Sequence, residues 1–405
     1  MSRPKTTETA STKNKNLSKK TPTKKSSATQ APKSDSATPF LIINGITHLS
    51  MKDIAQSLQS KILLNNGKGS ATMTKGGATV QFNTRQDHIV YQDVPINLIN
   101  KPKLNNKEIF VSYTDYSSVL IPLLATNLIQ GETPKLKTVV IDAGHGGKDS
   151  GAINQRLNIS EKTLTLKTAQ LLQKHLIKQQ KNVIMTRETD IYKNLKDRSK
   201  DAANADVFIS IHINAAQNAS AHGMECYIYT PKDSLLENIK NNSSQKISPL
   251  WNIPLAYCMN SALQKETKLT NRGVKKANFA VLKELPCPGI LIELGFISND
   301  EEAAKLNNPT FQEKIVQGLI NGLKKYEENL KKTRQAKNND HGKQSTSEKM
   351  QKLQPKSSGS TMLHRKHPLL ESHFEAKRLI LEKTHHIKSV SAISQEKPPI
   401  TIKKK

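Results

Sequence analysis

Residues 138–147 read TVVIDAGHGG and decide the fold of this 405-residue chain. The apolar and β-branched residues 139–141 predict a buried parallel strand. Asp142 then opens a glycine-rich turn, whose tight backbone aims the imidazole of His145 out of the carboxyl end of the strand. Open α/β sheets place their chemistry at that end, so His145 is a candidate ligand. A histidine after a strand is nevertheless more often a hydrogen-bonded structural residue.

Strands and helices alternate from residue 138 to residue 330. The apolar runs predict strands at residues 138–142, 182–187, 207–214, 223–230, 279–284 and 289–296, and helices at residues 161–179, 194–205, 254–266 and 309–330. Asn194 is the expected N-cap of the second helix. This alternation predicts an α/β domain with a mostly parallel sheet covered by helices on both faces.

A smaller domain precedes the α/β domain. Residues 39–130 combine a strand, an Asn44-Gly45 turn and a helix capped near Ser50 with several short alternating runs, which predicts a small α+β accessory domain. Residues 131–137 form a linker, and residues 1–38 and 331–405 are low-complexity tails predicted to be disordered.

Most of the positive charge lies in the two tails. Residues 1–38 hold nine Lys and Arg against two Asp and Glu, and residues 331–405 hold eighteen against six, so the ends supply +19 of the net charge of +28. Solvated tails explain this pattern, and the alternative is loose attraction to an anionic partner such as a membrane surface, cell-wall carboxylates or nucleic acid. No recognisable nucleic-acid-binding motif accompanies the charge, so specific nucleic-acid binding is not expected.

Other sequence features exclude several classes of protein. The cysteines lack the spacing of a metal site or a complete disulfide framework and are expected to be buried hydrophobes: Cys226, Cys258 and Cys287. No apolar run reaches the length of a transmembrane helix. The N-terminus has no apolar core of a secretory signal peptide, so none is visible.

Three residues at the predicted rim of the sheet have the chemistry of metal ligands. Glu161 opens the first helix and His212 lies in SIHIN at the end of the third strand. Together with His145 they offer two imidazoles and a carboxylate, which suits a catalytic zinc ion with one position left for water. Singly, each has a structural alternative: His212 as a satisfied core histidine, and Glu161 as a carboxylate that favours the start of a helix.

A fourth candidate, Glu293, lies inside the apolar strand ILIELGF. A carboxylate in such a strand is costly unless it is paired, lies near a metal or faces a cleft. The alternative to a catalytic role is an ion pair with Arg272 or Arg187. Two further polar residues, Arg198 and Asn299, are expected to be structural.

Residues 138–326 resemble the zinc-dependent N-acetylmuramoyl-L-alanine amidases of type 3. The blocks that carry the resemblance are VVIDAGHGGKDSGA, Ser160-Glu161-Lys162, MTRETDIYKNLKDRSKDAANADVFISIHINA, Gly223-Met224-Glu225 and NRGVKKANFAVLKELPCPGILIELGFISNDEEA. The resemblance implies zinc ligands His145, Glu161 and His212 and a catalytic Glu293. It also implies hydrolysis of the amide bond between N-acetylmuramic acid and L-alanine in peptidoglycan. Asn214 and Arg272 are the candidates for substrate contact.

The resemblance implies further expectations about context. The protein would act in the cell envelope or periplasm during wall remodelling or division, which conflicts with the absence of a visible signal peptide. An insertion at residues 231–253 is a candidate lid, with Glu237 placed to occupy the fourth zinc position until an activator protein removes it. The alternative function is a catalytically silent peptidoglycan-binding or scaffold protein. Residues 39–130 resemble the copper-amine-oxidase N-terminal-like domain through Ile43-Asn44-Gly45, the helix and IFVSYTDYSSVL.

Overall fold

The computed structural model describes residues 40–129, 131–230, 249–283 and 285–351. The predicted N-terminal tail, the candidate lid residue Glu237 and residues 352–405 lie outside these ranges. None of the helices in the described ranges is both long enough and apolar enough to span a bilayer.

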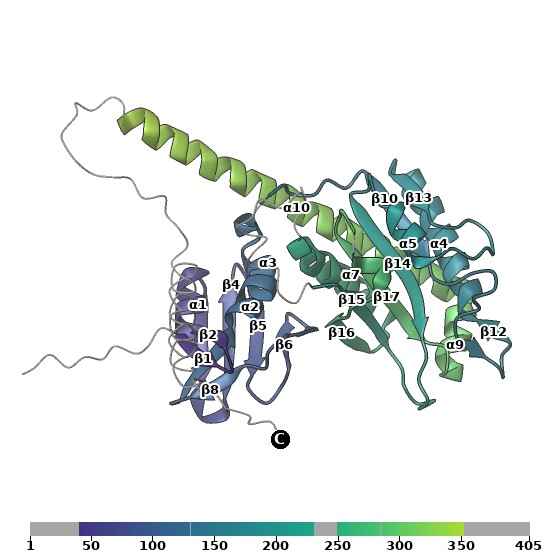
Figure 1. Cartoon of the computed structure of the whole chain (residues 1–405), viewed down its shortest axis with the longest axis horizontal. Helices are drawn as coiled ribbons and strands as arrows, with labels where there is room; N and C mark the ends of the chain where they lie inside the picture. The colour runs from purple at the N-terminus through teal and green to yellow at the C-terminus, as the bar shows by residue number, and fades with distance from the viewer. Residues whose placement is uncertain (1–39, 130, 231–248, 284, 352–405) are drawn as a thin grey trace, which may run out of the picture. The chain divides into compact units, whose positions relative to one another are not determined.

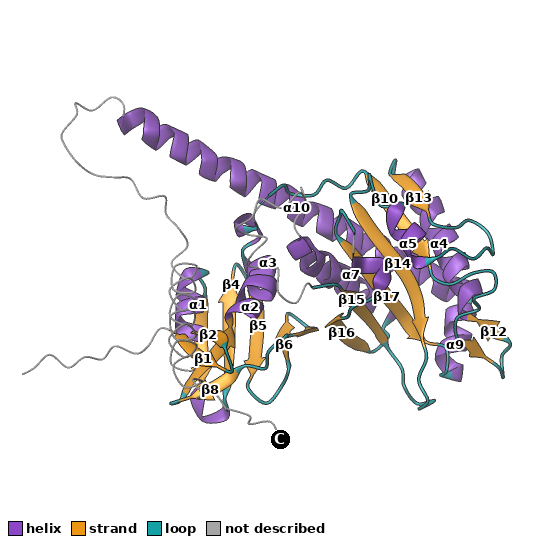
Figure 2. Cartoon of the chain, viewed as in Figure 1, coloured by secondary structure: helices purple, strands orange, loops and turns teal. Residues whose placement is uncertain are grey.

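The α/β domain is built on six neighbouring strands (Figures 1 and 2). In spatial order they are β13 (Asn182–Met185), β10 (Thr138–Ala143), β14 (Val207–Asn214), β17 (Gly289–Phe296), β15 (Met224–Ile228) and β16 (Asn271–Lys276). Neighbouring strands are parallel except for β17 and β15, which are antiparallel. The carboxyl ends of β10, β14 and β17 therefore lie on one edge, where the predicted ligands were expected.

The sheet does not end at β16. Val274 of β16 pairs in parallel with Ile96 of β7, and an antiparallel meander follows. The meander consists of β7 (Val94–Asn97), β6 (His88–Tyr91), β5 (Ala78–Asn83), β4 (Ser70–Lys75) and β3 (Lys61–Asn65). The result is a mixed sheet of eleven strands, so the expectation of a mostly parallel sheet is not confirmed. The sheet is mixed because β15 runs antiparallel to β17 and because the strands of the meander are antiparallel to one another.

Alternate residues of the central strands pack into two different cores, as expected when successive side chains point to opposite faces of a sheet. Val139 and Ile141 join the larger core, whereas Val140, Phe208 and Leu291 join the smaller one. The larger core includes side chains from α4 (Glu161–Lys178), α7 (Asn252–Thr267) and α10 (Pro309–Gln351). The smaller core includes Ala202, which follows α5 (Leu195–Lys200), and residues of α8 (Ala280–Lys283). Helical segments therefore cover both faces.

The structure corrects two of the predicted elements. Residues 280–283 of the expected strand 279–284 form the short helix α8. The helix that was expected to end at residue 330 continues to Gln351, and a separate helix, α9 (Asp300–Asn307), precedes it. Leu330 and Thr333 are buried, so packing continues past the predicted end of the helix. The predicted disordered tail therefore cannot begin at residue 331.

The small domain contains a second sheet and several short helices. The sheet order is β1 (Phe40–Ile43), β2 (Ile46–Ser50), β9 (Glu108–Ser112) and β8 (Lys103–Asn105). The helical segments are α1 (Met51–Ser57), α2 (Tyr113–Asp115), the π-helical turn η2 (Tyr116–Leu120) and α3 (Ile121–Leu124). The expected cap is confirmed, because the Ser50 hydroxyl accepts a hydrogen bond from the Lys52 amide at 3.1 Å. The remaining short elements are η1 (Asn66–Lys68), η3 (Thr126–Leu128), β11 (Ile153–Asn154), β12 (Ile159–Ser160) and η4 (Pro249–Trp251).

The middle of α10 contacts the segment that joins the two domains. Arg334 donates to the Pro134 carbonyl at 2.6 Å, and Lys337 donates to the carbonyls of Ile129 at 2.7 Å and Gly131 at 3.2 Å. Residues beyond the predicted end of the helix therefore supply hydrogen-bond donors to backbone oxygens of the linker region.

Candidate metal centre and active site

Glycines allow the predicted ligands to approach one another. A Cβ at Gly144 would lie 2.5 Å from the imidazole of His212. A Cβ at Gly151 would lie 2.6 Å from Glu161 Oε2 and 2.7 Å from His145 Cδ2, and its φ of +61° also disfavours other residues. Gly144 and Gly151 therefore make room for the three ligand side chains.

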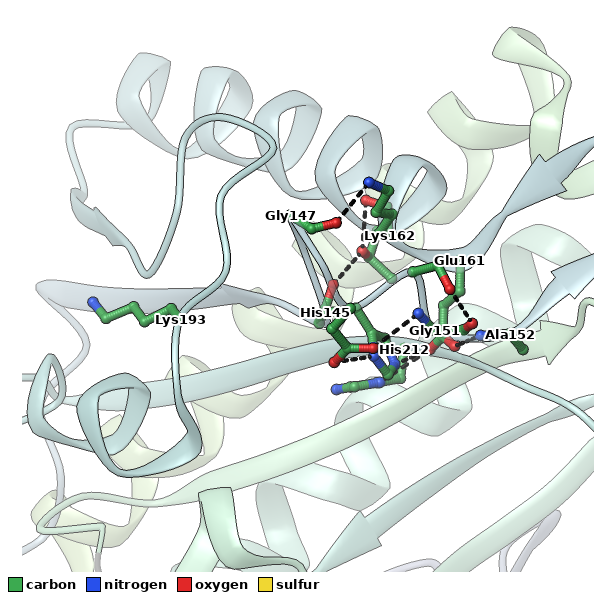
Figure 3. A network of polar contacts seen from close by, with 12 residues as sticks. His145, Gly147, Gly151, Ala152, Glu161, Lys162, Lys193 and His212 are labelled. Carbon is green, nitrogen blue, oxygen red and sulfur yellow. Dashed lines mark hydrogen bonds and ion pairs between the residues drawn. The ribbon is translucent and has the colours of Figure 1, made fainter.

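The three predicted ligands converge. Ligand atoms of His145, Glu161 and His212 all lie within 4.8 Å of one another. Glu161 Oε1 lies 3.1 Å from His145 Nε2 and 3.0 Å from His212 Nδ1, and Figure 3 shows both imidazoles beside this carboxylate. Two imidazole nitrogens and one carboxylate oxygen that face one point form a donor set suited to zinc.

Neighbouring groups fix the orientation of the ligands. The Ile213 amide donates to Glu161 Oε1 and the Ala152 amide to Oε2, both at 3.0 Å. His145 Nδ1 lies 2.9 Å from Asp149 Oδ2, which leaves Nε2 directed at the centre. A carboxylate behind a ligating histidine is a common way to fix the ring in metal sites.

The charges of the centre stabilise one another. Burial alone would lower the pKa of His145, but the carboxylates of Glu161 and Asp149 raise it to about 9. Burial would raise the pKa of Glu161, but hydrogen bonds with His145 and His212 hold it well below its usual range. Glu161 is therefore an ionised carboxylate, the form that binds a metal.

Two buried arginines hold the backbone beneath His145. Arg198 donates to Asp142 Oδ1 at 2.7 Å and to the His145 carbonyl at 2.6 Å. Arg187 donates to the carbonyls of Ala143 and Gly144, both at 2.8 Å. The expectation that Arg198 is structural agrees with these bonds. The support that Arg187 gives to the glycine-rich turn could not be predicted from the sequence, because its partners are backbone oxygens that no residue pattern reveals.

Glu293 lies on the strand next to that of His212, in direct register with it. Its Oε2 is buried and has no hydrogen-bond partner in the described part of the chain. Burial raises the pKa of Glu293 to about 7, and the negative charges of Glu161 and Glu225 act in the same direction. Neither arginine that was considered as its partner takes that role, because Arg187 binds backbone carbonyls and Arg272 binds Glu225.

The candidate substrate residues Asn214 and Arg272 meet at the carboxylate of Glu225, for which no role was predicted. Asn214 donates to Glu225 Oε1 at 2.6 Å and Arg272 donates to Glu225 Oε2 at 3.1 Å. The signal for Glu225 was its alternation with the apolar residues of β15, which placed it on the face opposite Met224 and Cys226.

The fold and these side chains define an α/β domain with a candidate metal centre and an unpaired buried carboxylate beside it. Residues 139–325 match the N-acetylmuramoyl-L-alanine amidase family. Residues 29–120 match the copper amine oxidase N-terminal domain.

Curated relatives and solved structures are each similar to about half of the chain. The probable cell wall amidase LytH of Staphylococcus epidermidis is 37% identical over 204 residues, which are 50% of this chain and 61% of LytH. The protein of the same name from Staphylococcus aureus is 33% identical over 207 residues, 51% of this chain and 64% of that protein. The chain thus spans less than two thirds of these relatives.

The solved structures that are similar to the chain include two amidases with more than 30% identity. The catalytic domain of CwlV, an N-acetylmuramoyl-L-alanine amidase from Bacillus (Paenibacillus) polymyxa var. colistinus, is 36% identical, with 47% of this chain and 98% of that chain covered and a TM-score of 0.40. The CwlD amidase from Clostridioides difficile, in complex with the GerS lipoprotein, is 32% identical, with 47% and 98% covered and a TM-score of 0.41.

Proposed function

We propose that this protein is a zinc-dependent peptidoglycan hydrolase that cleaves the amide bond between N-acetylmuramic acid and L-alanine. One observation carries the proposal: ligand atoms of His145, Glu161 and His212 converge within 4.8 Å. The unpaired Oε2 of Glu293, in register with His212 on the adjacent strand, supports it. A silent binding protein would have no use for a buried carboxylate whose ionisation is costly.

The residues have distinct roles in this hydrolysis. His145, Glu161 and His212 would hold zinc, which when bound polarises the substrate carbonyl and makes water more acidic. Glu293 accepts a proton at its unpaired oxygen from the attacking water and returns it to the leaving amine. Burial raises the pKa of Glu293 toward neutrality, which suits both steps because a general acid–base group works best near the operating pH. Asn214 and Arg272 contact the substrate.

The cellular role follows from the substrate. Peptidoglycan lies in the cell envelope or periplasm, so we place the protein there, in wall remodelling or division. The relative CwlD was solved with a lipoprotein, and we propose that an activator protein likewise binds this chain.

The decisive experiment measures new L-alanine amino termini released from purified peptidoglycan, together with the zinc content of the protein. Wild type should release them, and Glu293→Ala should retain zinc and lose at least about 100-fold in rate, the scale of a general base. Glu313→Ala is the matched control, because this glutamate is exposed on α10 and pairs with His175. The assay is run on the zinc-loaded proteins twice, once without any activator and once with cell extract added. If wild type releases no more amino termini than Glu293→Ala in either condition, the silent binding function is the correct one.

A further inference from the structure

Glu225 is a buried carboxylate to which the proposed hydrolysis assigns no role. Its side chain is 2% exposed and accepts hydrogen bonds from four side chains. The donors are Asn214 at 2.6 Å, Tyr227 at 3.0 Å, Arg272 at 3.1 Å, and Lys275. Burial would raise its pKa, but Lys275 and Arg272 lower it below the usual range, so Glu225 is ionised. A buried carboxylate with this many donors fixes the geometry of the side chains that bind it.

A bulge in β16 brings the two cations to the same carboxylate. Arg272 and Lys275 are three positions apart, and in a regular strand this spacing would direct them to opposite faces of the sheet. The register of β16 against β15 shifts between Met224 and Cys226, where Gly273 adopts a φ of +85°. A bulge re-aims the side chains next to it, and here both cations reach Glu225.

The cluster lies on the same row of the sheet as the metal centre. His212 is in register with Glu293, and Glu293 is in register with Glu225 on the next strand. Arg272 lies on β16, the strand next to that of Glu225. Neighbouring positions on four adjacent strands therefore connect the candidate ligand His212 to the guanidinium of Arg272. Neighbouring strands lie about 4.8 Å apart, which places the backbone at Arg272 roughly 10 Å from that at Glu293.

The cluster carries one more positive than negative charge. The side chain of Arg272 is 38% exposed, and its guanidinium lies 5.0 Å from the centre of the Phe296 ring. Its Nε is bound to Glu225, and its Nη1 reaches the His222 carbonyl only at 3.4 Å. The outer edge of the guanidinium therefore keeps donors for an acceptor in solution, and a planar guanidinium suits a carboxylate.

We propose that Glu225 is a positioning residue that holds Arg272, with Lys275 beside it, to receive a carboxylate of the substrate. This inference rests on the proposed hydrolysis. An extended peptide advances about 3.3 Å per residue, so the carboxylate belongs to an acidic residue within about three residues of the scissile amide. The enzyme would thus prefer stem peptides with a free acid over peptides in which that acid is amidated.

The test compares muramoyl dipeptides of L-alanine and D-glutamate whose glutamate carboxylates are free, singly amidated or doubly amidated. Wild type should show a kcat/KM about 10- to 100-fold higher on the dipeptide with free carboxylates than on the doubly amidated form, which is the range for hydrogen bonds to charged groups. The difference should arise mainly from KM. Arg272→Ala should reduce this ratio to about 1. Glu225→Gln keeps the shape of the side chain but removes its charge, and the ratio should fall at least about fivefold because Arg272 is no longer held.

Arg156→Ala is the matched control, because this exposed arginine pairs with Asp300 and belongs to neither cluster. Its ratio should equal that of wild type. An unchanged ratio in Arg272→Ala, an exposed position whose loss should not unfold the protein, would overturn the inference. So would an unchanged ratio in a folded Glu225→Gln variant, because the carboxylate would then position nothing.

A second measurement separates this inference from the proposed function. Binding of the dipeptide L-alanyl-D-glutamate, measured by calorimetry, requires no hydrolysis. If wild type cleaves nothing but binds the acid at least about 10-fold more tightly than the doubly amidated dipeptide, and Arg272→Ala does not, the carboxylate site stands and the amidase function fails. If wild type cleaves the muramoyl dipeptides without preference and binds both dipeptides equally, the amidase function stands and the carboxylate site fails.

Discussion

Glu293 shows how the burial of one carboxyl group connects stability to chemistry. Its oxygen has no hydrogen-bond partner among the described residues, and burial raises its pKa to about 7. The folded state therefore binds a proton more tightly than the unfolded state, in which a glutamate titrates near 4.3. Ionisation of Glu293 costs stability until a cation is present nearby.

This cost predicts a pH-dependent loss of stability in protein freed of metal by a chelator. Between about pH 4.5 and pH 7 the unfolded state loses the proton first, so the free energy of unfolding should fall as the pH rises and level off above pH 7. Relative to Glu293→Gln, which cannot ionise, wild type should lose about 2 to 3 kcal/mol. Urea unfolding of both proteins across this range measures the difference, and parallel curves would contradict the prediction. Added zinc should reduce the loss, because a nearby cation favours the charged form.

The candidate ligands could be predicted from the sequence because their positions follow simple rules. His145 and His212 come at the ends of apolar runs and Glu161 comes at the start of a helix, so topology alone brings them to one edge. Glu225 and Arg187 could not be assigned in the same way. The role of Glu225 depends on a bulge in a strand that was not predicted, and Arg187 binds backbone oxygens.

At the scale of elements, the contact of α7 with α10 depends on two glycines. A Cβ at Gly318 would lie 3.0 Å from the Leu263 Cα, and one at Gly322 would lie 2.6 Å from Met259 Sδ and 2.8 Å from the Met259 Cα. Glycine inside a helix costs about 0.5 to 1 kcal/mol relative to alanine, so intrinsic propensity alone would favour alanine at both positions. Close packing of the helices is the reason that glycine stands there.

Gly322→Ala should therefore destabilise the protein, although alanine is the better helix former. The added methyl group meets the backbone of α7, and overpacking of this kind costs about 1 to 3 kcal/mol. Thermal unfolding should show a lower midpoint for Gly322→Ala than for wild type. Lys314→Ala, on the exposed side of the same helix, should leave the midpoint within about 1 °C. A higher midpoint for Gly322→Ala would mean that the helix propensity of alanine outweighs the cost of overpacking, and it would contradict the prediction.

Helices and strands were predicted correctly from the sequence where the apolar run was long, and wrongly where it was short. Val207–Asn214 and Gly289–Phe296 were predicted at their observed limits because they are long apolar runs with polar ends. The run around residues 279–284 is too short to distinguish a strand from a buried helical turn, and it forms a helix. The strand Asn271–Lys276 was missed because its glycine and cations hide the alternation.

Across the whole described chain, one sheet runs through both domains. The described residues form one compact unit, in which Val274 pairs with Ile96. Beside this pair, Lys276 lies 3.5 Å from the fully buried Asp115. Asp115 also accepts bonds from the Ile99 and Asn100 amides at 2.6 Å and 2.8 Å. The sequence predicted two domains with a linker, and it could not reveal the shared sheet because a single register pair leaves no pattern.

The contact predicts that the two domains unfold together. Lys276→Ala leaves a buried carboxylate with fewer partners, which should cost about 1 to 3 kcal/mol and lower the unfolding midpoint of the whole chain. Calorimetry of the full chain should show one transition for wild type and a shifted or divided transition for the variant. Lys283→Ala, an exposed lysine on α8, is the control. Two separate transitions in wild type would show that the shared sheet does not couple the domains.

The hydrogen bonds between the middle of α10 and the linker region constrain the order in which the protein can mature during synthesis. The carbonyls of Ile129, Gly131 and Pro134 leave the ribosome about 200 residues before Arg334 and Lys337, which donate to them. Both domains can form most of their strands in that interval, because those strands precede α10. The junction between them waits for the last helix, so a nascent chain arrested before residue 334 would hold a complete small domain on a tether that lacks these donors.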